Sequence, residues 1–156
     1  MKKEEVLAQL KIAKSAHADW LYKAKILVNS KEDKENLTPM SAQECLFGQW
    51  FYVEGQKLSA LSNIPLESMK NIADLHQYIH EIYLNIFAVY YPKEDKSGFF
   101  SKYFTQNKKV LSELEIESVT YELKKLEALS SELLEEISRL ERRIVAVSDE
   151  KIETLG

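Results

Sequence analysis

The sequence contains few residues that form disulfides, interrupt helices or add backbone flexibility. Its 156 residues include one Cys, three Pro and four Gly. A single Cys cannot form an internal disulfide, which argues against a disulfide-stapled secreted scaffold and favours a reducing compartment, the cytoplasm. The scarcity of Gly and Pro also excludes collagen-like and low-complexity chains. We therefore expect a cytoplasmic protein with a packed core.

Long apolar runs and an excess of positive charge are missing as well. No run of about 18 apolar residues occurs, so we expect no membrane-spanning helix. Charges interrupt the first residues too often for a signal peptide. The chain carries 21 Lys and Arg against 25 Asp and Glu, a net charge of -4. This balance and the pI of about 5.5 argue against nucleic acid as a partner.

The sequence does have apolar residues in a helical period along almost its whole length. Spacings of three and four predict amphipathic helices over about 4–28 and 67–90. Ser41 and Glu44 have the spacing of a capping box, which predicts a second helix over about 42–61. A chain of this length is typical of one domain. We predict an all-α fold: a four-helix bundle with a long C-terminal coiled-coil-like helix.

The C-terminal helix is predicted over about 108–150 and carries a heptad pattern. Its a positions are Ile116, Leu123, Ser130, Ile137 and Ile144, and its d positions are Val119, Leu126, Leu133, Leu140 and Val147. Ile at a with Leu at d favours a two-stranded coil, whereas the flanking Leu129 and Leu134 widen the stripe, as in a bundle. Three uses of the heptad are left open: internal core, homodimer interface or partner-binding surface.

All three His and the single Cys are predicted to face inward. His17 lies on the apolar stripe of the first helix, Cys45 in the first turn of the second, and His76 and His80 on the stripe of the third. Residues four apart lie one above the other on a helix, so both imidazoles of the third helix can reach one ion. Three nitrogens and one sulfur are ligands that Zn²⁺ prefers. A lone His or Cys on an apolar face is more often a core residue, so the spacing alone leaves both interpretations open.

The neighbours of these residues form three motifs in chain order. Residues 17–20 read HxxW, residues 45–50 read CxFGxW, and residues 76–80 read HxxxH. Together the motifs resemble those of the chemoreceptor zinc-binding domain, called CZB, over about residues 17–80. The resemblance implies a four-helix bundle, often dimeric, whose zinc is held by His17, Cys45, His76 and His80.

The resemblance also implies an organisation and a function. Residues 1–92 would form the zinc-binding helices, and residues 99–153 would complete the bundle or dimerise, as one domain overall. In that family the domain is usually fused to a chemotaxis receptor or a diguanylate cyclase. The chain has neither a methyl-accepting hairpin nor a GGDEF-like sequence, so we expect a stand-alone member, a homodimer, with such a signalling protein as its partner.

The expected function is that of a zinc-binding regulatory module. Two alternatives remain at this point: an oxidant sensor that uses a zinc-bound Cys45 thiolate, and a structural coiled-coil adaptor stapled by zinc. Four protein ligands leave no open position on the ion, so we do not expect an enzyme.

Four further motif residues are expected to pack around the site: Trp20, Phe47, Gly48 and Trp50. The two Trp are large enough to separate a metal site from solvent. Gly48 follows Cys45 by about one turn, and without a side chain it allows a neighbouring group to approach closely.

Overall fold

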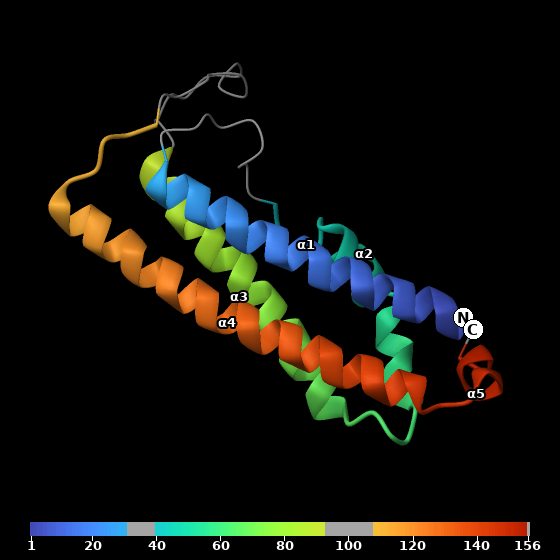
Figure 1. The fold of residues 1–156 in the computed structure, drawn as a ribbon. Helices are drawn as coiled ribbons and strands as arrows, with labels where there is room; N and C mark the ends of the chain where they lie inside the picture. The colour runs from blue at the N-terminus through green and yellow to red at the C-terminus, as the bar shows by residue number, and fades with distance from the viewer. Residues whose placement is uncertain (31–39, 93–107, 156) are drawn as a thin grey trace, which may run out of the picture.

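The computed structural model describes residues 1–30, 40–92 and 108–155. These residues form helices and turns without any strand, which confirms the all-α class. Three long helices make up most of the molecule (Figure 1): α1 (Lys3–Asn29), α3 (Leu66–Tyr90) and α4 (Glu113–Val145). The first two agree with the predicted helices to within about one residue at each end. None of the helices described is long and apolar enough to cross a bilayer.

The second predicted helix is wrong in its extent. In place of one helix over 42–61, the chain forms the six-residue α2 (Leu46–Phe51) and then the 3-10 helix η2 (Gly55–Ala60). The Glu44 carboxylate does accept a hydrogen bond from the Ser41 backbone N–H at 2.9 Å. This contact closes a turn before α2 rather than starting a long helix.

Cys45 marks the point at which the predicted helix is interrupted. Its backbone is extended, with φ -70° and ψ 152°, so it is the N-cap of α2 and not a residue of the first helical turn. The bundle therefore consists of three long helices and one short, broken segment, which packs against α1 and α3.

The C-terminal helix is shorter than predicted. Its N-terminus has a complete capping box, in which the Ser112 side chain accepts from the Glu115 N–H and the Glu115 side chain accepts from the Ser112 N–H. The 33 residues of α4 span roughly 50 Å at about 1.5 Å per residue. The short α5 (Asp149–Glu153) follows it, and residues 99–107 of the predicted C-terminal segment lie outside the described residues.

The heptad residues within α4 form an internal seam that packs against both α1 and α3, and Val147 lies just after this helix. All of them are buried except Ile116, which is 51% exposed, contrary to its predicted place in the seam. The Lys25–Glu127 ion pair at 2.8 Å aligns a residue near the C-terminal end of α1 with a point more than three turns into α4. The beginning of α4 thus extends past the end of α1 (Figure 1), which explains why Ile116 is exposed. The heptad serves as internal core.

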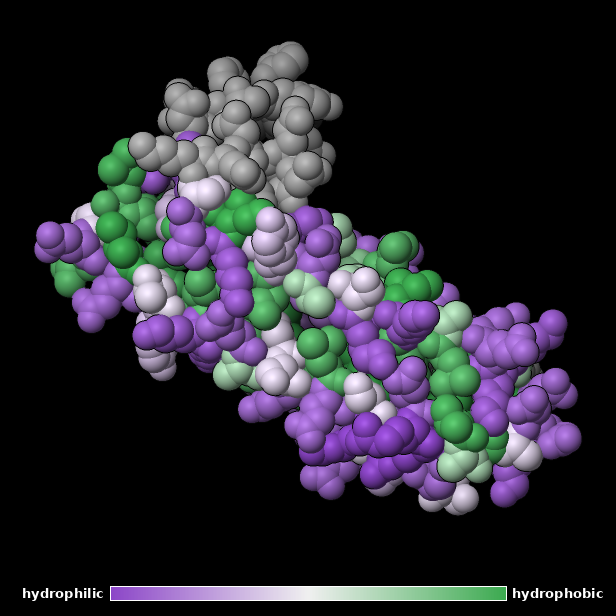
Figure 2. Space-filling model, in the orientation of Figure 1, coloured by the Kyte–Doolittle hydropathy of each residue, from purple (hydrophilic) through white to green (hydrophobic). Residues whose placement is uncertain are grey.

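Ion pairs join α1 to α4 and α5. Lys14 pairs with Glu141, and Lys3 pairs with Asp149 at 3.4 Å, in addition to Lys25 with Glu127. Figure 2 shows one face of the molecule, on which hydrophilic residues are dispersed among apolar ones along its length. Exposed pairs of this kind each contribute about 0–1 kcal/mol, so burial of the seam is the main stabilising term.

Candidate metal centre

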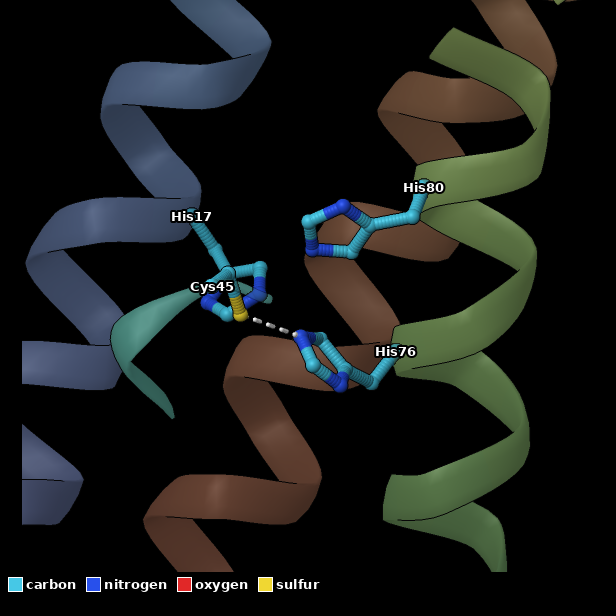
Figure 3. A group of neighbouring side chains, drawn as sticks. All are labelled: His17, Cys45, His76 and His80. Atoms are coloured by element: carbon cyan, nitrogen blue, oxygen red, sulfur yellow. Dashed lines mark hydrogen bonds between the residues drawn. The ribbon is translucent and has the colours of Figure 1, made fainter. Parts of the chain in front are cut away.

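The structure brings the four predicted ligands together in the interior of the bundle (Figure 3). Three elements supply them: α1 carries His17, the N-cap of α2 is Cys45, and α3 carries His76 and His80. All four side chains are buried. One donor atom from each residue lies within 4.8 Å of the donor atoms of the other three.

The helical period of α1 and α3 carries the imidazoles inward. His17 occupies the same buried stripe as Ala13 and Ala24. On α3, His76 and His80 are one turn apart, and their ring centroids are 4.8 Å from each other. The rings of His17 and His76, from different helices, are equally close at 4.8 Å. The apolar stripes of α1 and α3, which would otherwise hold aliphatic side chains, thus hold three imidazoles between them.

Cys45 is placed by the turn that precedes α2. Its Sγ accepts a hydrogen bond from the Gly48 backbone N–H at 3.2 Å, the usual contact of an N-cap side chain. The same sulfur lies 3.1 Å from Nε2 of His76 (Figure 3). Burial raises the pKa of the Cys45 thiol, and the backbone N–H groups of Gly48 and Phe47 act in the opposite direction. A bound cation would add the charge that makes the thiolate the stable form.

Each imidazole uses Nδ1 for a contact within the protein. The partners are the Ala13 carbonyl for His17 at 2.7 Å, the Met40 carbonyl for His80 at 2.8 Å, and the Tyr52 hydroxyl for His76 at 3.1 Å. A carbonyl oxygen can only accept, so Nδ1 of His17 and of His80 carries the proton. Nε2 of both rings is then an unprotonated acceptor, as a metal ligand must be.

Two of these nitrogens have no hydrogen-bond partner within the described part of the chain. They are Nε2 of His17 and Nε2 of His80, and both are fully buried. Leaving a buried acceptor unpaired costs about 1–3 kcal/mol, so native proteins rarely do so. A metal ion between the rings would satisfy both nitrogens at once.

The imidazoles are neutral, which is the form that binds metals. Burial lowers the pKa of His17 to about 4 and the pKa of His76 to about 2. Burial lowers the pKa of His80 as well, partly offset by its hydrogen bond to the Met40 carbonyl. Protons therefore do not compete with a cation for these rings near neutral pH.

The dimensions of the cluster suit a small tetrahedral ion. Zn–N bonds of about 2.0–2.1 Å and Zn–S bonds of about 2.3 Å place the donor atoms of a tetrahedral three-nitrogen, one-sulfur site roughly 3.3–3.6 Å apart. The donor atoms here range from 3.1 Å, between Cys45 and His76, to no more than 4.8 Å. Side-chain adjustments of about 1 Å would bring all four to bonding distance.

Aromatic rings surround the cluster. Phe47 is buried and presents T-shaped contacts to His17 at 5.6 Å and to His76 at 5.1 Å. Trp20 lies 4.6 Å from the ring of His80. Trp50 lies farther out, behind Phe47 at 6.1 Å. The first two rings line the cluster directly, and Trp50 packs against that lining.

Gly48 occupies a position that no other residue can fill unless the backbone moves. A Cβ atom there would lie 1.7 Å from the carbonyl oxygen of Ala42, far inside van der Waals contact. The close approach expected from the sequence is thus made by the backbone of the preceding turn. This contact presses the turn that carries Cys45 against α2.

A surface cavity of about 330 Å³ lies next to His80. Its lining includes Met40, Glu44, Gln77 and Glu81. The cavity therefore places the carboxylates of Glu44 and Glu81 on the outer side of His80.

The sequence did not reveal the three groups that orient the imidazoles. Two of them are backbone carbonyls, of Ala13 and Met40, which have no side-chain signature. The third, Tyr52, lies two residues after the CxFGxW motif, and its polar tip on an otherwise apolar segment is the signal that could have identified it.

Comparisons of the chain with protein-family models, curated proteins and solved structures find no match. The resemblance to the CZB family therefore remains a prediction from the three motifs. The fold and the cluster define a coarser class: an all-α protein with a buried group of three His and one Cys at metal-binding distance.

Proposed function

We propose that this protein binds one Zn²⁺ ion through His17, Cys45, His76 and His80, and that zinc occupancy regulates the packing of its helices. The observation that carries the proposal is the pair of buried Nε2 atoms, of His17 and His80, that lack a hydrogen-bond partner and converge with Cys45 Sγ and His76 Nε2. Such atoms are costly unless an ion occupies the space between them.

The donor set favours zinc over other ions. Three neutral imidazoles and one thiolate are typical of tetrahedral zinc sites, whereas Mg²⁺ and Ca²⁺ require oxygen ligands. Four protein ligands would form a closed site, which suits a structural or regulatory ion and not a catalytic one. When bound, the ion would supply a positive charge that stabilises the Cys45 thiolate.

The ligands come from α1, α2 and α3, and α4 supplies none. Zinc would join the broken segment around α2 to the two long helices beside it. Because this arrangement of ligands exists only in the folded state, the binding free energy becomes conformational free energy. A change in zinc occupancy would alter how firmly α2 is held, and a signalling partner of the chemotaxis or cyclic-di-GMP type would detect that change.

The two alternative functions, an oxidant sensor and a zinc-stapled adaptor, require different properties of the same site. An oxidant sensor needs an accessible sulfur, but Cys45 is only 7% exposed. A zinc-stapled adaptor would hold its ion permanently. The zinc affinity, compared with the free zinc concentration in the cell, therefore separates the adaptor from the regulator.

The test is the metal content of the purified protein after incubation with zinc and removal of excess ion. We expect one zinc per chain in the wild type and loss of stoichiometric zinc in Cys45→Ala, with helical circular dichroism retained. Competition with a chromophoric chelator should show an affinity at least about 100-fold lower in that variant, more than removing an orienting partner would cause.

A matched control is available on the same helix. Gln77 follows His76 directly but is exposed, so Gln77→Ala should bind zinc like the wild type. A wild-type protein that takes up no zinc would refute the proposal. Unchanged stoichiometry in Cys45→Ala would refute the ligand set.

A further inference from the structure

His76 differs from the other two imidazoles because both of its ring nitrogens contact the same short helix. Cys45, the N-cap of α2, places its Sγ 3.1 Å from Nε2 of His76. Tyr52, the C-cap of α2, places its hydroxyl 3.1 Å from Nδ1 of the same ring. The two ends of α2 therefore bracket one imidazole of α3.

The tautomer of His76 depends on where the proton of Tyr52 goes. The Tyr52 hydroxyl has one proton and also donates to the Ala73 carbonyl at 3.4 Å. A carbonyl only accepts, so when the Tyr52 proton is directed at Ala73, the Tyr52 oxygen accepts the N–H of Nδ1. His76 Nε2 is then free of a proton and directed at the sulfur of Cys45.

The opposite arrangement would disable the ligand. If Tyr52 donated its proton to Nδ1, Nε2 of His76 would carry the ring proton and could not bind a metal. The Tyr52 ring is held in place by an edge contact to Phe51 at 5.4 Å and lies 5.8 Å from the His76 ring. Packing therefore fixes the position of the hydroxyl, and the Ala73 carbonyl offers its proton an acceptor other than Nδ1.

Tyr52 is also the one orienting group here that a substitution can remove cleanly. His17 and His80 are oriented by backbone carbonyls, of Ala13 and Met40, which every residue type possesses. Only His76 is oriented by a side chain.

We propose that Tyr52 is the positioning residue of the metal centre. It holds His76 in the tautomer whose Nε2 binds the ion, and it ties the C-terminal end of α2 to the imidazole that Cys45 contacts at the other end. This inference rests on the proposed function, because a positioning residue presupposes a metal to be bound. It also locates the regulation: loss of either contact to His76 would loosen one end of α2.

The test is Tyr52→Phe, which removes one oxygen and keeps the ring. We expect the zinc affinity to fall about 10- to 100-fold, as when other outer partners of metal-binding His residues are removed, with the stoichiometry still one per chain. Nitrogen NMR of the metal-free protein provides a readout that loss of packing would not move. His76 should be protonated at Nδ1 in the wild type and should gain an Nε2–H population in the variant.

The matched control is Tyr90→Phe. The Tyr90 hydroxyl donates to the Val28 carbonyl at 3.2 Å, away from the cluster, so this variant loses a comparable hydrogen bond. It should show wild-type zinc affinity and an unchanged His76 tautomer.

The failure of this inference and the failure of the proposed function give different results. Wild-type zinc affinity in Tyr52→Phe, or a His76 tautomer that does not change, would overturn the role of Tyr52 and leave the zinc site intact. No zinc in the wild-type protein would overturn both.

Discussion

The α4 helix and the segment from Ala42 to Leu61 have different structures and different roles in the molecule. α4 is an unbroken helix of 33 residues whose apolar seam packs against two other helices. The segment is interrupted after α2 and again after η2, within 20 residues. The regular element supplies no residue of the His and Cys cluster, whereas the irregular one supplies Cys45 and also Tyr52, which contacts His76.

This contrast separates two roles, structural support and the placement of the residues of the cluster. A repeated apolar pattern produces a rigid support, but it places side chains only where the helical period allows. A short helix with two caps can present one residue from each end to the same target, as Cys45 and Tyr52 do toward His76. Support and ligand placement should therefore respond separately to mutation.

The largest effect is expected in the seam. Leu133 is fully buried, so Leu133→Ala should lower the free energy of unfolding by about 3 kcal/mol, through lost burial and the cavity left behind. Urea denaturation followed by circular dichroism measures this. The control is Ile116→Ala, from the same heptad but 51% exposed, which should change stability by no more than about 0.5 kcal/mol. Equal losses in the two variants would contradict an internal seam.

An intermediate effect is expected at the turn before α2. In Gly48→Ala the new methyl group would overlap the Ala42 carbonyl, so the backbone must move, at a cost of about 1–3 kcal/mol. The zinc affinity should fall more than about tenfold, because the displaced turn carries Cys45. Chelator competition and thermal unfolding together measure both effects.

Gly55→Ala is the control for that turn. Its methyl group would meet the Trp50 ring at 3.2 Å, and a side chain can yield where a backbone carbonyl cannot. The zinc affinity of Gly55→Ala should therefore remain near that of the wild type. A Gly48→Ala protein with wild-type affinity would show that the turn does not position Cys45.

The smallest effect is expected at the polar residue of the seam. Ser130 is buried, and its hydroxyl has no hydrogen-bond partner among the described residues. Ser130→Ala should raise the free energy of unfolding by about 0.5–1.5 kcal/mol, since it removes an unpaired polar group and improves helix propensity. Zinc affinity should not change. A loss of stability instead would mean that the hydroxyl makes a contact that Ala cannot replace.

The three long helices were predictable because hydrophobic periodicity persists over many turns. The cluster of three His and one Cys was predictable because the imidazoles lie on the apolar stripes of α1 and α3 and the single Cys lies at a compatible position before α2. The exposure of Ile116 was not predictable, because the heptad continues past the point where α1 ends. The apolar pattern of one helix does not predict where the helix packed against it ends.

The broken second helix and the orienting groups could not be inferred for a different reason. The need for Gly48 comes from the Ala42 carbonyl, a contact that exists only after the turn has formed. Backbone carbonyls occur at every residue, so the sequence does not distinguish those of Ala13 and Met40 from any other. Tyr52 is one of eight Tyr, and its type alone does not distinguish it.

The placement of α4 also sets an order of events during synthesis. All four ligands lie within residues 17–80, whereas the helix that covers the apolar faces of α1 and α3 begins at Glu113. At about 5–20 residues per second, α1 leaves the ribosome roughly ten seconds before its main packing partner begins to emerge. An ion bound in that interval would hold the first three elements together while their apolar stripes are still uncovered. The metal centre would then protect the nascent chain before it serves the finished protein.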